Sequence, residues 1–293
     1  MTIPVVHPPS AEEFRRRYVQ TRTPVILAGA IQSWPALSSW TPLYLKHRVG
    51  EVIVSVETHA TPIFCPNTNW NAFPCEQMML REYIDRISAG PSDKWHYAAQ
   101  VPLAETLPAL LTDIRQPDFH RPQTNKIAFW VGAKGTGTHL HYDPYDNIMA
   151  VVRGTKRFVL FRPGQFGRLY PYPAFSRWGH FSQVDVNAPD LARFPRYARA
   201  EPITCVVSAG QALYLPHGWW HYVVNEDLTI AVNFFYRISF LRRLTLPMLR
   251  FRIVALYKRW SKLRSAFPAR RAPAAAPTMS SECPGSLEGR RDD

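Results

Sequence analysis

From Asn125 onward the chain reads as one short apolar segment after another, and this succession constrains the fold more than any other feature. Each segment is rich in β-branched and aromatic residues and ends near glycine, proline or asparagine, which predicts strands joined by turns. About seven such strands predict a compact antiparallel barrel or a double-sheet jelly roll. The predicted strands read NKIAFWVG, THLHYD, NIMAVVRG, KRFVLFRP, ITCVVSAGQALYLP, WWHYVVN and LTIAVNFFYR.

The sequence also predicts the form of two connections between these strands. VVRGTKRF predicts a hairpin that reverses at residues 153–155. Residues 164–202 form a long irregular insertion with several tyrosines and arginines. Long loops in compact domains often serve as lids or substrate walls, so the insertion is expected to line the substrate's path or to be structural.

The residues before the strand region predict mixed helices and strands. Ser10 and Glu13 occupy the positions of a reciprocal helix cap, which predicts a helix that begins after Ser10. The whole chain is therefore expected to be mainly β with flanking helices: a double-stranded β-helix core, an α/β N-terminal region and a C-terminal helix. The other predicted elements are strands at residues 23–29, 51–58 and 94–100, and helices at residues 75–87 and 103–114.

The C-terminal end carries most of the positive charge. The formal net charge is +13, and residues 241–293 hold twelve Lys/Arg against four Asp/Glu. Such a basic region can contact nucleic acid, anionic lipid or acidic protein, and charge alone does not choose among them. Apolar residues at steps of three and four predict an amphipathic helix that packs on the domain or pairs two chains as a homodimer. The predicted apolar stripe is Leu249, Ile253, Leu256, Trp260 and Leu263.

These patterns predict one domain followed by an extension. The last residues are too rich in proline, alanine and serine to bury a core, so disorder is expected there. The expected divisions are a domain at residues 1–240, with its barrel core at about 94–240 and an N-terminal decoration at 1–93, a basic helix at 241–266 and a disordered tail at 267–293.

The cysteines and the hydropathy pattern indicate a cytoplasmic protein. The four cysteines form no Cys-x-x-Cys pair, and the N-terminus lacks a cationic segment followed by an apolar run. No stretch of eighteen residues is apolar and free of charge, so no transmembrane segment is expected.

The segment THLHYDPYDN raises the question of metal binding. His141 and Asp143 are two residues apart, so on an extended chain their side chains project from the same face and can reach one ion. A distant histidine, His221 in YLPHGWWHYVV, would complete a facial triad of two histidines and one carboxylate. This ligand set leaves coordination positions open on non-haem Fe(II).

Two related architectures compete for this sequence, and both belong to the cupin superfamily. The second cupin motif, Gly-x5-Pro-x-Gly-x2-His-x3-Asn, is matched in full from Gly210 to Asn225. The first cupin motif is matched approximately, with aspartate in place of glutamate, and on that view four residues would hold the metal. The residues of that alternative set are His139, His141, Asp146 and His221.

The other architecture is the Jumonji-C (JmjC) branch. Residues 138–163 resemble its Thr-x-x-His-x-Asp-x3-Asn motif with the following Gly-x-Lys hairpin, and ALYLPHGWWHYVV and IAVNFFYR resemble its later strands. The resemblance covers roughly residues 10–240 and is most detailed for the cupin-like single-domain hydroxylases that act on hypoxia-inducible factor or on wybutosine in tRNA. It implies an Fe(II)- and 2-oxoglutarate-dependent dioxygenase that hydroxylates a C–H bond.

A 2-oxoglutarate enzyme must neutralise the cosubstrate's far carboxylate in a partly dry pocket, which calls for a cation and hydroxyl donors. Lys156 and Thr138 offer these groups, and the resemblance assigns them that role. It also implies cosubstrate contacts for Tyr97, Asn147 and Asn233. The four-ligand cupin motif accounts for none of these positions, so the triad of His141, Asp143 and His221 is preferred.

The substrate is less constrained than the mechanism. The resemblance favours a protein side chain, while the basic C-terminal end leaves tRNA open as a partner. A small molecule, a demethylation reaction by the same chemistry, and a non-catalytic metal-binding cupin that acts as a binding module are the remaining alternatives.

Overall fold

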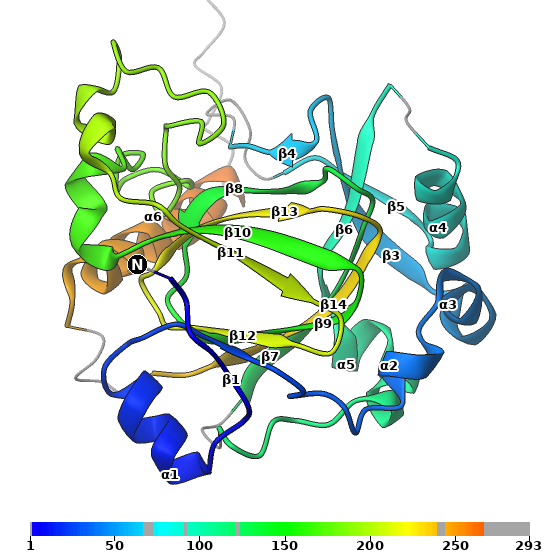
Figure 1. Ribbon diagram of the computed structural model, residues 1–293. Helices are drawn as coiled ribbons and strands as arrows, with labels where there is room; N and C mark the ends of the chain where they lie inside the picture. Colours follow the sequence, from blue (N-terminus) through cyan, green and yellow to red (C-terminus); the bar gives the residue numbers. More distant parts are fainter. Residues whose placement is uncertain (1, 67–72, 91–92, 121–123, 239–243, 267–293) are drawn as a thin grey trace, which may run out of the picture.

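The computed structural model describes residues 2–66, 73–90, 93–120, 124–238 and 244–266. Its strands form two sheets that pack face to face, with helices outside them (Figure 1). This is the predicted jelly-roll arrangement. The expected disordered tail lies outside the described residues.

The larger sheet contains nine strands, and the smaller sheet contains five. Most neighbours are antiparallel, whereas the β1–β2 and β4–β8 pairs are parallel. In spatial order, the larger sheet consists of β1 (Val5–Val6), β2 (Val25–Leu27), β12 (Ala212–Leu215), β9 (Asp146–Arg153), β14 (Thr229–Tyr236), β7 (Thr124–Gly132), β6 (Trp95–Pro102), β3 (Ile53–His59) and β5 (Cys75–Met79). The smaller sheet consists of β11 (Ile203–Ser208), β10 (Thr155–Phe161), β13 (Trp220–Asn225), β8 (Gly137–Tyr142) and β4 (Ile63–Phe64). The N-terminal region, expected as a decoration, thus contributes β1, β2, β3 and β5 to the larger sheet.

Apolar side chains fill the space between the sheets and the space between the larger sheet and the helices. Met149 and Val151 of β9 face Phe158 and Leu160 of β10 in the inner cluster. Burying a side chain of this size contributes roughly 1.5–3 kcal/mol. Helices cover the other face of the larger sheet. The helices are α1 (Ala11–Phe14), continued by a π-helical turn (Arg15–Val19), α2 (Ala36–Ser39), α3 (Pro42–Val49), α4 (Leu80–Ser88), α5 (Leu103–Thr106) and α6 (Leu246–Ala266), with 3₁₀ turns at Pro108–Asp113, Pro163–Arg168 and Pro195–Arg199.

Two of the predicted helices are wrong in part. Residues 75–79 of the predicted helix 75–87 form β5, because they pair with the otherwise unpaired edge of β3. The predicted helix 103–114 breaks at Leu107, whose backbone leaves the α conformation (φ −128°, ψ 49°) before Pro108, since the residue before a proline is disfavoured in that conformation.

The reciprocal cap at the first helix is only half formed. The Ser10 hydroxyl accepts a hydrogen bond from the Glu13 backbone N–H at 3.3 Å. The Glu13 carboxylate instead accepts from Arg17 at 2.8 Å, one turn further along the helix. An i,i+4 ion pair therefore replaces the second half of the cap.

The predicted hairpin at residues 153–155 is also wrong in kind. The chain does reverse at Gly154, which has a φ of +75°. However, β9 belongs to the larger sheet and β10 to the smaller one, so this connection crosses between sheets. A Cβ at Gly154 would lie 2.5 Å from the Leu228 carbonyl, so no larger residue fits this crossing.

Helix α6 packs on the domain through a different face from the predicted stripe. Met248 and Val254 are buried, and Met248 joins the apolar cluster on the outer face of the smaller sheet. The stripe residues Leu249, Leu256 and Trp260 are exposed. Pairing of two chains through this helix stays a prediction. No helix in the described part of the chain is long and apolar enough to cross a membrane.

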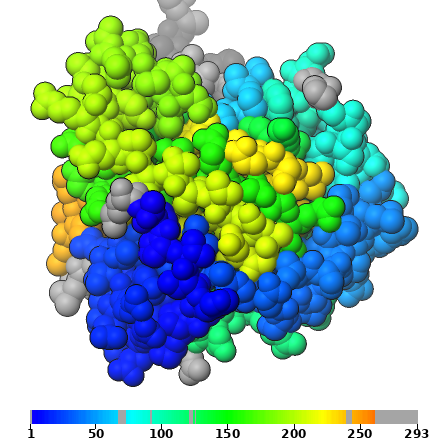
Figure 2. All heavy atoms as spheres, viewed as in Figure 1, coloured from blue at the N-terminus to red at the C-terminus, as the bar shows by residue number. Residues whose placement is uncertain are grey.

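Residues 164–202 gather on one side of the molecule next to α6, seen in yellow-green beside orange in Figure 2. Part of this insertion extends the smaller sheet, because the Tyr142 backbone N–H donates to the His180 carbonyl at 3.1 Å and that of Ser182 to the Leu140 carbonyl at 2.8 Å. The structural role expected for part of the insertion is therefore present.

Candidate functional site

Two adjacent strands of the smaller sheet bring the predicted metal ligands together. β8 and β13 pair so that His141 lies opposite His221. Asp143 follows the last residue of β8, and its Oδ2 lies 3.7 Å from Nε2 of His221. One ligand atom from each residue lies within 4.8 Å of the other two. In the described part of the chain, no other group of histidine, cysteine or carboxylate side chains converges in this way.

Backbone carbonyls fix the orientation of both imidazoles. Nδ1 of His141 lies 2.8 Å from the His139 carbonyl, and Nδ1 of His221 lies 3.1 Å from the Trp219 carbonyl. A carbonyl only accepts, so each Nδ1 carries a proton and donates. Each Nε2 therefore presents a lone pair, which is the form that binds a metal.

Burial sets the charge state of the three side chains. It lowers the pKa of His141 to about 3 and that of His221 to about 4, so both rings are neutral at pH 7. Burial also raises the pKa of the Asp143 carboxyl, against the opposing effects of His141 and Lys126. A divalent cation would favour the carboxylate form and remove this cost. The donor set therefore fits a divalent transition metal.

The alternative four-ligand arrangement does not form, because two of its members bind elsewhere. His139 has one ring nitrogen 3.3 Å from Sγ of Cys65 and the other 3.0 Å from the Ser182 carbonyl. The Asp146 carboxylate accepts from Nδ1 of His217 at 2.7 Å.

Lys156 lies in the same pocket as the three ligands and is almost completely buried. Its ammonium donates to the Tyr97 hydroxyl at 3.1 Å and to Oδ1 of Asn225 at 2.6 Å. Burial lowers the pKa of Lys156 to about 7, although Asp227 opposes the shift. No carboxylate among the described residues forms an ion pair with it, so the pocket contains a dehydrated cation suited to an anionic guest.

The other predicted cosubstrate residues line this pocket as well. Nδ2 of Asn233 donates to Oδ1 of Asn147 at 2.8 Å. Oδ1 of Asn233 and Nε1 of Trp130 are buried without a hydrogen-bond partner in the described structure. Such orphaned groups are costly unless a guest satisfies them. The eight predicted residues in the lining are Tyr97, Thr138, His141, Asp143, Asn147, Lys156, His221 and Asn233.

Sequence reasoning missed three features of the site. Asn225 belongs to the matched cupin motif, but nothing in the sequence connects it with Lys156. Trp130 has no sequence feature beyond its place in a predicted strand. Phe181 of the insertion stacks on the His141 ring, with centroids 5.0 Å apart. The insertion thus forms a wall beside the metal ligands.

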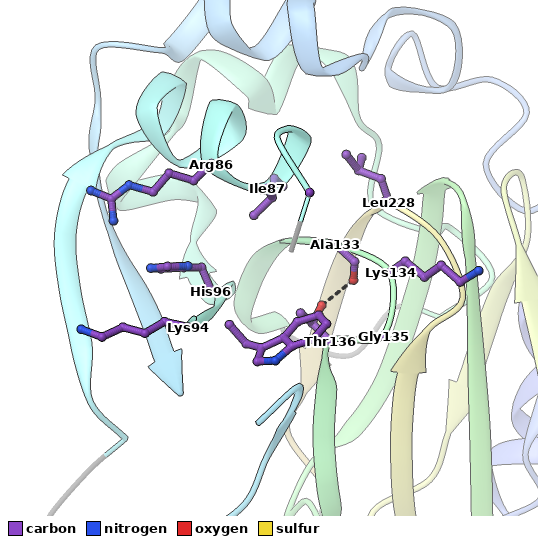
Figure 3. A pocket seen from close by; sticks show the side chains of 11 residues that line it. Arg86, Ile87, Lys94, His96, Ala133, Lys134, Gly135, Thr136 and Leu228 are labelled. Carbon is purple, nitrogen blue, oxygen red and sulfur yellow. Dashed lines mark hydrogen bonds between the residues drawn. The ribbon is translucent and has the colours of Figure 1, made fainter. Parts of the chain in front are cut away.

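A second cavity of about 560 Å³ lies between α4, β6 and the β7–β8 loop. Figure 3 shows Arg86, Lys94 and Lys134 extending away from its centre, whereas Ile87 points into it. None of the metal-ligand candidates lines this cavity. Two of its lining residues contact Asn225: the Gly135 N–H donates to the Asn225 carbonyl at 2.7 Å, and the Thr136 hydroxyl accepts from Nδ2 of Asn225 at 2.9 Å.

Comparison with known families agrees with this geometry. The model of the family described as "Cupin-like domain" matches residues 10–242. The chain belongs to this cupin-like family. Its members that match here include JmjC proteins, and JmjC relatives of this kind are 2-oxoglutarate-dependent oxygenases that use Fe(II).

Three curated relatives illustrate the range within the cupin-like family. The chain is 34% identical over 239 residues to "Lysine-specific demethylase 8" of Xenopus tropicalis, covering 80% of this chain and 52% of the relative. It is 31% identical over 268 residues to "Bifunctional peptidase and (3S)-lysyl hydroxylase JMJD7" of Homo sapiens, covering 80% and 83%. It is 28% identical over 251 residues to "tRNA wybutosine-synthesizing protein 5" of Gallus gallus, covering 80% and 77%. The chain spans about half the length of this demethylase and of several other curated relatives.

Proposed function

We propose that this protein is an Fe(II)- and 2-oxoglutarate-dependent oxygenase that hydroxylates a C–H bond, with His141, Asp143 and His221 as the iron ligands. The observation that carries the proposal is the placement of this triad and the buried Lys156 ammonium in one pocket. A metal-binding module without catalysis would not need a dehydrated cation beside its metal. Iron and 2-oxoglutarate, when bound, supply the oxidising chemistry that places one oxygen atom on the substrate.

The side chains of this chain bind and orient the cosubstrate. Lys156 pairs with the far carboxylate of 2-oxoglutarate, and the hydroxyls of Thr138 and Tyr97 donate hydrogen bonds to it. Asn147 and Asn233 also line the pocket and would hold other polar groups of the cosubstrate. Because these groups are excluded from water, the ion pair is stronger than it would be at the surface.

The substrate is a protein side chain, and the structure favours a cationic one. Glu57 lies opposite Tyr97 in the β3–β6 ladder, so both side chains project from the same face of the sheet. Glu57 lines a cavity of about 370 Å³, and Gln100 lines both this cavity and the metal pocket. Burial raises the pKa of Glu57 to about 8, and a bound lysine or arginine would return it to the charged form. The lysine-directed names of two relatives agree with such a substrate.

The test compares uncoupled turnover in the wild type and Asp143→Ala. Wild-type protein with Fe(II) and 2-oxoglutarate should form succinate slowly without a substrate, and the variant should lose this activity. Asp93→Ala, which removes an exposed carboxylate, is the matched control and should keep it. Absence of succinate from iron-loaded wild type would favour the binding-module alternative.

The substrate class has a separate test. Cell extract is incubated with wild type and with Asp143→Ala, and proteins and tRNA are then searched by mass spectrometry for a gain of one oxygen atom. The proposal expects the mass increase on a lysine or arginine of a protein. An increase confined to tRNA would contradict the protein-side-chain assignment.

A further inference from the structure

The β-sheet alone does not explain where the Asp143 carboxylate lies. The β8–β13 ladder places His141 opposite His221 and ends at the pair of Tyr142 and Trp220. Asp143 lies one residue beyond that ladder, in the turn between β8 and β9. Its carboxylate is therefore positioned by whatever holds this turn against the turn between β12 and β13.

One backbone hydrogen bond joins the two turns directly. The Gly218 N–H donates to the Asp143 carbonyl at 2.9 Å. Gly218 has a φ of +78°, in the left-handed region that favours glycine. The turn that leads into His221 thus contacts the backbone of the carboxylate ligand.

A buried pair of side chains makes the second connection. Oδ1 of Asp146, at the other end of the β8–β9 turn, accepts from the His217 backbone N–H at 3.0 Å and from its ring Nδ1 at 2.7 Å. The exposed fractions of the two side chains are 4% for Asp146 and 0% for His217. Water therefore has no access to replace these bonds, and a buried polar pair that loses one member leaves the other unsatisfied.

The side chains of Asp146 and its neighbour Asn147 project from opposite faces of β9. Successive side chains on a strand project to opposite faces. Asn147 lines the metal pocket, whereas Asp146 binds the neighbouring turn. The Asp146 carboxylate, a metal ligand in the four-ligand alternative, thus connects the two turns through hydrogen bonds to His217.

We propose that Asp146 and His217 form a positioning pair that sets the Asp143 carboxylate against the two imidazoles and thereby raises the affinity for the metal. The pair does not touch the metal or the cosubstrate. The inference rests on the proposed function, because it takes the triad as the metal site. Residues that orient metal ligands from outside typically change metal affinity by about 10–100-fold when they are replaced.

The test measures Mn(II) affinity by the loss of the free-ion electron paramagnetic resonance signal, without 2-oxoglutarate and without turnover. His217→Leu, which removes the Nδ1 donor, should bind Mn(II) about 10–100-fold more weakly than the wild type. His217→Asn keeps an N–H donor at nearly the same place and should restore affinity to within about threefold of the wild type. Such rescue is not expected of a residue that only fills the core.

Two further variants separate positioning from folding. Tyr83→Phe removes a buried hydroxyl that binds the backbone of β6 and β7 in the larger sheet, from which no candidate metal ligand comes, so it should lower stability and leave Mn(II) affinity unchanged. Asp146→Asn keeps the acceptor oxygen but loses the charge, and it should weaken Mn(II) binding about threefold or more even if His217→Leu does not fold. Unchanged affinity in the folded pair variants would overturn the inference. Failure of the wild type to bind Mn(II) would instead refute the proposed metal site.

Discussion

Replacing Lys156 with methionine should stabilise the protein in a way that depends on pH. Methionine has a similar length and no charge, so Lys156→Met removes the cost of burying an ammonium. It also removes the hydrogen bonds to Tyr97 and Asn225, and that loss is independent of pH over the range in which both acceptors stay neutral. The pH dependence of the difference in unfolding free energy therefore isolates the charge contribution.

The size follows from the two pKa values of the lysine. Its ordinary pKa is 10.5, and burial lowers it to about 7 in the folded protein. Between these values the unfolded chain binds more protons than the folded chain, so wild-type stability rises as pH increases. According to the linkage relation, burial of the Lys156 charge lowers the unfolding free energy of the wild type by roughly 4 kcal/mol at pH 7 and by about 2 kcal/mol at pH 9.

The assay is urea unfolding of wild type and Lys156→Met at pH 7, 8 and 9, followed by tryptophan fluorescence. The stability advantage of the variant, whatever its absolute value, should shrink by about 2 kcal/mol from pH 7 to pH 9. A difference that stays constant over this range would show that Lys156 is not held as a dehydrated cation. The variant should also fail to bind 2-oxoglutarate, which calorimetry with Mn(II)-loaded protein would measure.

Two further predictions concern residues outside the metal pocket. The Tyr83 hydroxyl accepts from the Ala98 N–H at 3.1 Å and donates to the Val131 carbonyl at 2.5 Å, so Tyr83→Phe should lower the unfolding free energy by about 1–3 kcal/mol; an unchanged urea midpoint would contradict this. Glu57→Gln should raise the KM for a lysine or arginine peptide at least several-fold and leave uncoupled succinate formation at the wild-type rate. Equal loss of both activities would mean that Glu57 supports the pocket rather than the substrate.

The sequence predicts those parts of the site that depend on local spacing. The spacing of His141 and Asp143 predicts side chains on one face of an extended chain, and the two do converge, although Asp143 lies one residue beyond the end of β8. His221 can be predicted as the third ligand only from a sequence motif, because its pairing with His141 depends on which strands are neighbours. No such local pattern predicted the hydrogen-bond partner of Asp146, because His217 lies 71 residues away in the chain.

The errors in the fold have the same origin. Residues 75–79 have a helix-compatible pattern, but the free edge of β3 offers backbone partners that no local pattern reveals. Gly154 correctly marks a reversal, yet a turn residue does not tell whether the next strand pairs with the last one or joins the facing sheet. Local sequence determines where the chain reverses, whereas long-range strand pairing determines which sheet the next strand joins.

The crossing at Gly154 divides the pocket between the two sheets. All three candidate metal ligands come from the smaller sheet or its adjoining turn, whereas Lys156 and Asn225 of that sheet face Tyr97 and Trp130 of the larger one. The ammonium loses its water only when the halves of the sandwich close over it. On the proposed function, 2-oxoglutarate binding would therefore mark the last stage of assembly. A chain in which only the smaller sheet has formed could bring the histidines together but would have no closed pocket for the acid.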